Sequence, residues 1–404
     1  MRIKYYHIED FPQDKIRILL DKEFKREFWK ALKSVIGSDE KIAKIVKYPR
    51  SVITKMRLGK NSRGTTYFMP LWMVIKFSKV LVKKGYKQFS LRNIEKHIIA
   101  YKTNSVSSVI TNPNLPLPED ERLIRIFTHL VADGYGGGIY ENSKNQKHYE
   151  SPHYTNINKE LVNEFIEDLK VFGNVPYNKK EKWNCFKIII PWSIKYILEH
   201  IYKVKISASK GRFPRRFFNL PKRLIYQILK AFCDDEGTIQ DNGITVSSSN
   251  KKQLEDLRRL MILAGFDEKF VTKVKLVRRS CYILKFYGPN FILFSKKTKL
   301  THPEKQAILE FQINRHLKHT TPQPKEERIS KILELLKEPL TSIQIAQKLG
   351  ISQTYTEVYL RELIRKDLVI KFRVRGKNKI AYISGLNYSS RTAAMPRLAC
   401  TNTY

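Results

Sequence analysis

Two apolar segments of this chain end in the same way, and their relation constrains the fold more than any other feature. The first is LIRIFTHLVADG (residues 123–134) and the second is LIYQILKAFCDDEG (residues 224–237). Each has the apolar spacing of a helix and ends on a carboxylate, Asp133 or Glu236, followed by a glycine. Recurrence of one pattern within a chain indicates an internal duplication. The chain is therefore expected to contain two copies of one unit.

The residue types within these segments predict that the two helices pack closely. Thr128 and Ala132 are four residues apart and share one helix face, and Ala231 holds the place of Thr128 in the second segment. Small residues there would allow two helix backbones to approach. The glycines, Gly134 and Gly237, are expected to take the left-handed conformation that ends a helix.

This packing would bring Asp133 and Glu236 together at two helix C-termini. A carboxylate there opposes the helix dipole, and each raises the cost of ionising the other. Divalent cations between them would remove both penalties. Mg²⁺ held by oxygen ligands can activate water and stabilise a leaving phosphate oxygen. The spacing therefore predicts a metal site for phosphate chemistry.

These segments resemble the two LAGLIDADG motifs of monomeric homing endonucleases, best at FTHLVADG and KAFCDDEG. Strand, strand and helix signals follow each motif in the order typical of that family, and the resemblance covers residues 118–316. It implies an α+β fold with a pseudo-twofold core of two αββαββα repeats and saddle-shaped antiparallel sheets. It also implies cleavage of both strands of a long double-stranded DNA site by a monomer that uses Mg²⁺ or Mn²⁺.

The resemblance carries individual roles to matching residues. Asp133 and Glu236 match the acidic positions that bind the catalytic metals. Lys210, in the segment ISASKGRFP (residues 206–214), matches the basic active-site residue. Three positions depart from the pattern, namely Thr128 for a glycine, Val131 for an aspartate and Asp235 for a small residue. The extra carboxylate of Asp235 is open to two interpretations, an auxiliary ligand or a sign of drift, and His129 is interpreted as a packed interface residue.

Charge independently indicates the class of partner. The chain has 76 Lys and Arg against 38 Asp and Glu, a net charge of +38, spread over all its parts. Such an excess favours nucleic acid. No apolar run is long enough to span a membrane, and scattered cysteines without a CxxC pair favour a cytoplasmic setting. A basic run beside phenylalanines predicts DNA contacts by Arg212, Arg215 and Arg216.

Proline-rich connectors at residues 111–118 and 319–324 predict flanking domains. Residues 1–115 are expected to form a helical domain, in which a helix capped by Ser38 and a second one over residues 51–57 make a helix-turn-helix. Residues 325–386 show three helices and a basic hairpin, which resemble a winged helix-turn-helix with DNA contacts at Arg373, Arg375 and Lys377. Residues 387–404 are expected to be a disordered tail.

Two other functions fit the same sequence. The chain could be a transcription regulator that uses the LAGLIDADG scaffold to bind DNA without cleavage, or an intron-RNA maturase. Intact carboxylates at residues 133 and 236 favour the endonuclease.

Overall fold

The computed structural model describes residues 3–59, 66–103, 108–141, 147–182, 184–207, 211–317, 325–351, 353–373 and 380–385. The second connector and the tail expected at residues 387–404 lie outside these ranges. The fold is mixed α+β, and the strand pairs whose register is defined are antiparallel. The chain forms two compact units, one of Met1–Gly237, Val246–Lys285 and Lys297–Pro303, the other of Thr238–Thr245, Phe286–Lys296 and Glu304–Tyr404. None of the described helices is long and apolar enough to cross a membrane.

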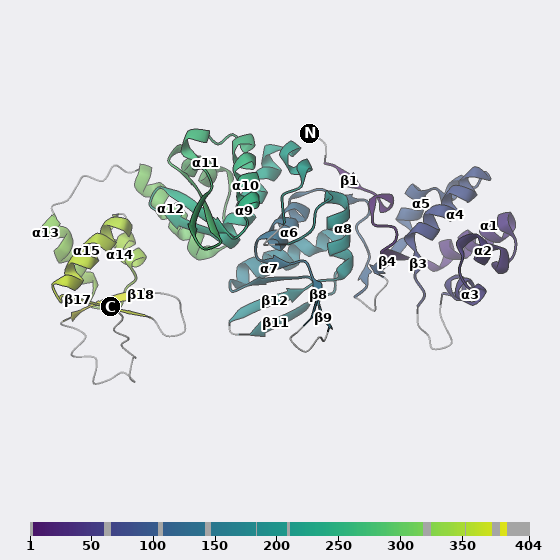
Figure 1. Ribbon diagram of the computed structural model, residues 1–404, viewed down its shortest axis with the longest axis horizontal. Helices are drawn as coiled ribbons and strands as arrows, with labels where there is room; N and C mark the ends of the chain where they lie inside the picture. The colour runs from purple at the N-terminus through teal and green to yellow at the C-terminus, as the bar shows by residue number, and fades with distance from the viewer. Residues whose placement is uncertain are drawn as a thin grey trace. The chain divides into compact units, whose positions relative to one another are not determined.

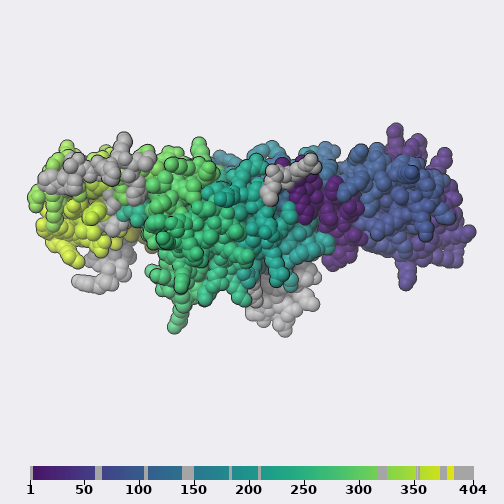
Figure 2. Space-filling view, turned by 90° about the horizontal axis from the view of Figure 1, so that it is seen from above, coloured from purple at the N-terminus to yellow at the C-terminus, as the bar shows by residue number. Residues whose placement is uncertain are grey.

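The N-terminal region contains a sheet as well as helices, and the prediction of a helical domain did not include this sheet. The segment Ile16–Leu20 alternates buried and partly exposed residues, which is the pattern of a half-buried strand, and it pairs with Ile98–Thr103. Helices pack around this sheet over an aromatic core that includes Trp29, Phe77 and Phe89. The N-terminal region is drawn in purple and blue in the space-filling view (Figure 2). The sheet order is β3 (Met69–Pro70), β2 (Ile16–Leu20), β4 (Ile98–Thr103) and β5 (Ile110–Thr111), and the helices are α1 (Lys22–Ile36), α2 (Asp39–Val46), α3 (Arg50–Leu58), α4 (Leu71–Lys83) and α5 (Leu91–Lys96).

Two short helices, α2 and α3, meet at a turn, as the sequence predicts. The side chain of Ser38 accepts a hydrogen bond from the Lys41 backbone N–H and begins α2. Asp39, whose side chain is buried, joins three helices. Its carboxylate accepts hydrogen bonds from Thr54 (3.1 Å) and Arg57 (3.2 Å) of α3, and Lys33 of α1 lies 3.2 Å away.

Replacing Asp39 by asparagine is expected to destabilise α2 and α3 by about 1–3 kcal/mol, because the donors Thr54, Arg57 and Lys33 lose a charged acceptor. Burial raises the pKa of Asp39, but the hydrogen bonds from Arg57, Lys33 and Thr54 outweigh it and hold the pKa below its ordinary value. Such a carboxylate stabilises the fold above its unfolded pKa and loses this contribution as the pH falls through the folded pKa. Hydrogen exchange of the α2 and α3 amides should therefore show a lower opening free energy for the variant than for the parent at pH 7. This difference should become smaller below about pH 4. An equal difference at both values would contradict this.

The first connector, residues 111–118, contains no helix, as its prolines predict. Within it, β6 (Leu117–Pro118) pairs with β1 (Tyr5–Tyr6). Glu119, at the end of the connector, is buried and accepts a hydrogen bond from the Tyr6 hydroxyl (2.7 Å). The connector thus ties the start of the chain to the region that follows.

Two copies of an αββαββα unit follow, and this confirms the predicted duplication (Figure 1). The sheet of the first copy has the order β7-β10-β12-β11 and that of the second has the order β13-β14-β16-β15. If the four sheet strands of each copy are counted along the chain, both sheets have the same order: first, second, fourth and third strand. The first copy consists of α6 (Glu121–Ala132), β7 (Gly134–Tyr135), β10 (His153–Asn156), α7 (Lys159–Leu169), β11 (Asn178–Lys182), β12 (Cys185–Ile189) and α8 (Trp192–Tyr202), with an inserted hairpin of β8 (Gly138–Glu141) and β9 (Lys147–Glu150).

The second copy repeats local details as well as topology. In each copy an asparagine, Asn158 or Asn250, caps the helix that follows the second strand. In each, a residue with positive φ, Asn184 (58°) or Ser280 (57°), precedes the fourth strand. The copy consists of α9 (Lys222–Glu236), β13 (Gly237–Gln240), β14 (Gly243–Ser248), α10 (Lys251–Ala264), β15 (Lys275–Arg278), β16 (Cys281–Tyr287) and α11 (Pro289–Lys297), and α12 (Pro303–Leu317) comes next.

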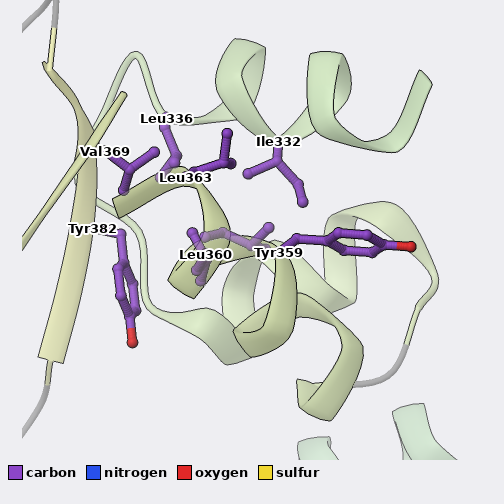
Figure 3. Packing of buried hydrophobic residues seen from close by; sticks show 8 residues of the cluster. Ile332, Leu336, Tyr359, Leu360, Leu363, Val369 and Tyr382 are labelled. Atoms are coloured by element: carbon purple, nitrogen blue, oxygen red, sulfur yellow. The ribbon is translucent and has the colours of Figure 1, made fainter. Parts of the chain in front are cut away.

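The last described region has the predicted order of three helices and two strands. Thr341 and Gln344 form a capping box that begins the second helix, and Gly350, with φ 65°, ends it. Figure 3 shows its apolar core. The elements are α13 (Lys325–Leu335), α14 (Ser342–Leu349), α15 (Gln353–Arg365) and the antiparallel pair β17 (Val369–Arg373) and β18 (Ile380–Ser384), and the core residues are Ile332, Leu336, Ile345, Tyr359, Leu360, Leu363, Val369 and Tyr382.

Candidate metal and nucleic-acid site

The two motif helices pack along each other, as their sequences predict. Thr128 on α6 and Ala231 on α9 are both fully buried. Arg125 of α6 donates a hydrogen bond to Gln227 of α9 (2.9 Å) and two to Asp168 of α7 (2.6 and 2.8 Å). The helix pair is therefore held by partly buried hydrogen bonds as well as by close packing.

Asp133 lies at the end of this pair, directly after α6. The side-chain amide of Asn156, at the end of β10, donates to Asp133 Oδ2 (3.1 Å) and to Asp235 Oδ1 (3.4 Å). One amide thus bridges a carboxylate of each motif. No sequence pattern singles out Asn156, because its place beside both motifs depends on the fold of β10.

The side chain of Asp235 is buried inside the helix pair, where it contacts residues of the first repeat. Its Oδ1 accepts a hydrogen bond from the Tyr154 hydroxyl (2.7 Å), and its Oδ2 lies 2.8 Å from Nδ1 of His129. The side chains of both His129 and Asp235 are fully inaccessible to solvent. Asp235 therefore forms an ion pair between α9 and α6, and His129 is the interface residue that the sequence predicted.

The ionisation of this cluster follows from burial and charge. Burial lowers the pKa of His129, but the charge of Asp235 and its hydrogen bond outweigh burial and hold the pKa above the ordinary value. Burial, followed by the charge of Asp235, raises the pKa of Tyr154 far above its usual range. Tyr154 therefore keeps its proton and donates a hydrogen bond to Asp235.

Glu236, the last residue of α9, lies beside an open hollow. A cavity of about 290 Å³ is lined by Glu236, by Ala132 at the end of α6, and by four serines and one cysteine. The ends of both motif helices therefore border the same cavity. The serines and cysteine are Ser247, Ser248, Ser249, Ser280 and Cys281.

The positions after the two carboxylates require glycine because a Cβ atom would not fit there. The prediction that these glycines adopt the left-handed conformation is wrong. Neither belongs to the described glycines with positive φ, and Gly237 has φ −83°. A Cβ on Gly134 would lie 2.5 Å from the Cα of Leu130, and one on Gly237 would lie 2.4 Å from the carbonyl oxygen of Cys233. The chain leaves each helix so tightly that a Cβ would collide with the preceding turn.

A third buried charge cluster supports α9 from the side of α7. Lys230 contacts both carboxylate oxygens of Glu164 (2.8 and 2.9 Å) and lies 3.3 Å from Asp234. Burial raises the pKa of Glu164, but the charge of Lys230 and its hydrogen bond outweigh burial, so the pKa lies below its ordinary value. Asp234 also accepts two backbone N–H bonds, from Thr301 and His302. These acids have internal partners and are not candidates for a metal site.

The remaining predicted site residues differ in their placement. Lys210, Arg375 and Lys377 lie outside the described residues. Arg212 is paired with Asp256 (2.5 and 2.8 Å) and Arg216 with Glu119, so both guanidinium groups serve internal ion pairs. Arg215 and Arg373 are exposed, and their contact with DNA stays a prediction.

The donors at the ends of α6 and α9 fit a hydrated, hard divalent cation. Carboxylate and hydroxyl oxygens suit Mg²⁺, which commonly keeps several waters and uses only one or two protein carboxylates. Among the described residues, no three His, Cys, Asp or Glu side chains converge to hold a metal by themselves.

Comparison with known proteins shows distant structural similarity only. No family model matches the chain, and no curated protein matches it. The structure of mesophilic variants of the homing endonuclease I-DmoI aligns at 14% identity and a TM-score of 0.33, over 44% of this chain and 94% of that one. The structure of I-DmoI in complex with DNA and Ca aligns at 15% identity and a TM-score of 0.35, over 47% of this chain and 97% of that one. The structure of full-length DUF199/WhiA from Thermatoga maritima aligns at 11% identity and a TM-score of 0.33, over 63% of this chain and 93% of that one. At these values the function is inferred from the site itself.

Proposed function

We propose that this protein is a metal-dependent endonuclease that cleaves both strands of double-stranded DNA at a long site and acts as a monomer. The observation that carries the proposal is the convergence of the two duplicated helix ends. Asn156 bridges Asp133 to Asp235, and Ala132 and Glu236 border one cavity. The motifs of this chain resemble those of LAGLIDADG endonucleases, in which such a pair of acids serves hydrolysis.

In this proposal Asp133 and Glu236 hold Mg²⁺ or Mn²⁺, which activates water and stabilises the leaving oxygen when it is bound. The four serine hydroxyls of the cavity offer hydrogen bonds to water and to phosphate oxygens. Lys210 is the proposed group that orients water or stabilises charge on phosphate. Asp235 is left out of the metal site because His129 and Tyr154 occupy its oxygens.

The third strand of each repeat supports DNA as the partner. Both β11 and β15 are at the edge of their sheet, and their described side chains are exposed. They carry Lys179 and Lys180 in the first repeat and Lys275 and Arg278 in the second. Exposed basic strands in equivalent places can follow the phosphate backbone on both sides of the site.

The flanking regions are proposed to lengthen the DNA footprint. The pair α2 and α3 is proposed as a helix-turn-helix, with exposed Arg50 and Lys55 on α3. Residues 325–386 are proposed as a winged helix. In it, Arg373, Arg375 and Lys377 of the hairpin contact phosphate, and α15 presents exposed Arg361 and Arg365.

A cleavage and binding assay tests the proposal. The full chain is incubated with Mg²⁺ and a library of duplex DNA, and the ends of any breaks are sequenced. The Asp133→Asn, Glu236→Gln double variant is the matched control. Site-specific breaks by the parent alone, abolished by a chelator, are the expected result. Tight binding without breaks by either protein would overturn the endonuclease and favour a DNA-binding regulator, and preference for structured RNA would favour a maturase.

DNA binding is expected to weaken steeply with salt, because a chain with a net charge of +38 would release many counterions from DNA. With roughly 6–10 phosphate contacts, affinity should fall about 10³- to 10⁵-fold between 50 and 200 mM salt. Fluorescence anisotropy of a labelled duplex over this range measures the slope. Affinity that is independent of salt would contradict the proposed phosphate contacts.

A further inference from the structure

The turn between β13 and β14 contacts the helix α15, which lies far along the chain. Oδ1 of Asp241, in this turn, accepts a hydrogen bond (2.9 Å) from the backbone N–H of Gln353, 112 residues later. Gln353 is the first residue of α15. The first N–H groups of a helix have no partner within the helix, and the helix dipole favours a negative charge beside them. Asp241 therefore stabilises the beginning of α15 from a distant part of the sequence.

Asp241 is held from a second side by α12. The guanidinium group of Arg315 donates a hydrogen bond to the backbone carbonyl oxygen of Asp241 (3.0 Å), and its Nη1 lies 3.6 Å from Oδ1. The side chains of Arg315 and Asp241 are only 15% and 19% exposed, so salt screens their attraction less than that of a surface pair. One aspartate thus links the turn, α12 and α15.

The turn itself is held in place by the chain that leads into α11. The backbone N–H of Gly288 donates a hydrogen bond to the carbonyl oxygen of Asn242 (3.0 Å). A Cβ on Gly243 would lie 2.4 Å from the carbonyl oxygen of Phe286, so the two backbones are in close contact there. The turn therefore offers α15 a fixed support.

The contact at Gln353 extends into the body of the C-terminal region. The side-chain amide of Gln353 donates hydrogen bonds to Glu357 of α15 (2.9 Å) and to the hydroxyl of Ser342, the first residue of α14 (3.3 Å). The Ser342 hydroxyl in turn donates to Glu357 (3.3 Å). These bonds join α14 to α15 beside the residue that Asp241 holds. The support therefore acts on both helices together.

The outer face of α15 suits contact with bases in the major groove. Tyr355, Val358, Arg361 and Arg365 are exposed and are spaced three or four residues apart, so they share one helix face. Tyr355 and Val358 are 62% and 47% exposed. Apolar groups of this kind contact thymine methyl groups, and arginine bonds guanine. The end of α15 that Asp241 holds is therefore followed directly by a face that fits DNA.

We infer that Asp241 is a positioning residue that fixes the spacing between the DNA segment bound by the second repeat and the segment bound by α15. This inference depends on the proposed DNA binding of both parts. Because the support is rigid, the two segments have to lie at one distance and one rotation along the double helix. A flexibly tethered region would instead accept a range of distances.

Duplexes with altered spacing test the inference. Hydroxyl-radical footprinting on a duplex that the parent cleaves first locates the segment of α15, which is the one whose protection is lost in the Arg361→Ala, Arg365→Ala double variant. About five base pairs, half of a helical turn, are then inserted between this segment and the segment protected by the second repeat. The parent is expected to lose affinity about 10-fold or more, to the level of the double variant, because both parts can no longer bind together.

Asp241→Ala is expected to behave differently from the parent. It should bind the unaltered duplex several-fold more weakly, because α15 is no longer held in position. The insertion should lower its affinity less than about 3-fold, because the released region can follow its displaced segment. Asp241→Asn keeps an oxygen that can accept from Gln353, so it should retain most of the parental dependence on spacing.

Hydrogen exchange separates positioning from loss of structure. The Gln353 amide should exchange faster in Asp241→Ala, while the amides of Leu360 and Leu363, whose side chains are in the core, stay as protected as in the parent. An equal response of the parent and Asp241→Ala to the insertion, or a footprint that is unchanged without the two arginines, would overturn the inference while the parent still cleaves. A parent that binds no DNA overturns the proposed function and the inference together.

Discussion

Replacing His129 alone by phenylalanine is expected to destabilise the α6–α9 helix pair by about 3–5 kcal/mol, the cost of removing one partner of a buried ion pair. Phe232 is the equivalent residue on α9, so phenylalanine already suits this type of position. The cost would arise from Asp235, whose carboxyl group would remain buried without its cationic partner. Asp235→Ala alone, which copies Ala132 of the first motif, would similarly leave His129 without this carboxylate.

The double variant His129→Phe, Asp235→Ala is expected to recover much of this loss. Replacing both members of a buried pair by apolar residues is often neutral or stabilising, because neither charge then has to be desolvated. Only the bonds from Tyr154 and Asn156 to Asp235 would still be lost. Hydrogen exchange of the α6 and α9 amides in all four proteins measures the coupling. Strictly additive losses would show that the two residues do not form an energetic pair.

The same variants have a defined pH dependence. The pKa of His129 is raised in the folded chain, because the charge of Asp235 outweighs burial. A group whose pKa is raised on folding contributes its full stabilisation below the unfolded pKa and loses it as the pH rises through the folded value. The loss of stability of the α6–α9 helix pair in His129→Phe, relative to the parent, should therefore be largest below about pH 6.5 and should decrease in alkaline solution.

Each site carboxylate is also expected to be indispensable by itself. Asp133→Asn and Glu236→Gln should each lower the cleavage rate by about 10²- to 10³-fold or more, because each removes a charge that holds the cation. DNA binding should stay equal or become tighter, since a negative charge near phosphate is lost. Single-turnover cleavage and anisotropy on one duplex separate the two effects.

Glu255→Gln provides the matched control for these substitutions. Glu255 is an acid on the surface of α10, half exposed and paired with Lys251 (3.6 Å), away from the motif helices in sequence. It should retain parental cleavage and binding. A similar loss in all three variants would mean that the rate follows net charge and that Asp133 and Glu236 have no special role.

Much of the fold could be predicted because its signals are local. The acid-glycine ends predicted the duplicated helices, Ser38 and Thr341 predicted helix starts, and the prolines at residues 113–118 predicted a connector without a helix. The N-terminal sheet was missed because β2 and β4 are far apart in the sequence. Their apolar residues were interpreted without knowledge of their pairing.

The candidate site could be predicted only in outline. A motif identifies Asp133 and Glu236, but the residues that support them come from other elements. Tyr154 and Asn156 belong to β10, more than twenty residues beyond α6, and only folding places them beside Asp235. Aligning the strand ends of the two repeats would have paired Asn156 with Ser248 and drawn attention to both. The ion pairs of Arg212 and Arg216 could not be predicted, because Asp256 and Glu119 are distant in sequence.

After each motif helix the backbone turns so close to the preceding helical turn that only glycine fits, which helps in aligning proteins that carry such motifs. A Cβ at Gly134 or Gly237 would collide with backbone atoms, which cannot move aside as a flexible side chain can. These two positions are therefore closed to every other amino acid while the helix ends keep their shape. Packing residues can vary in compensating pairs, as Thr128 and Ala231 do between the repeats. When diverged chains are aligned, the two glycines are thus fixed reference points from which the neighbouring carboxylates can be located.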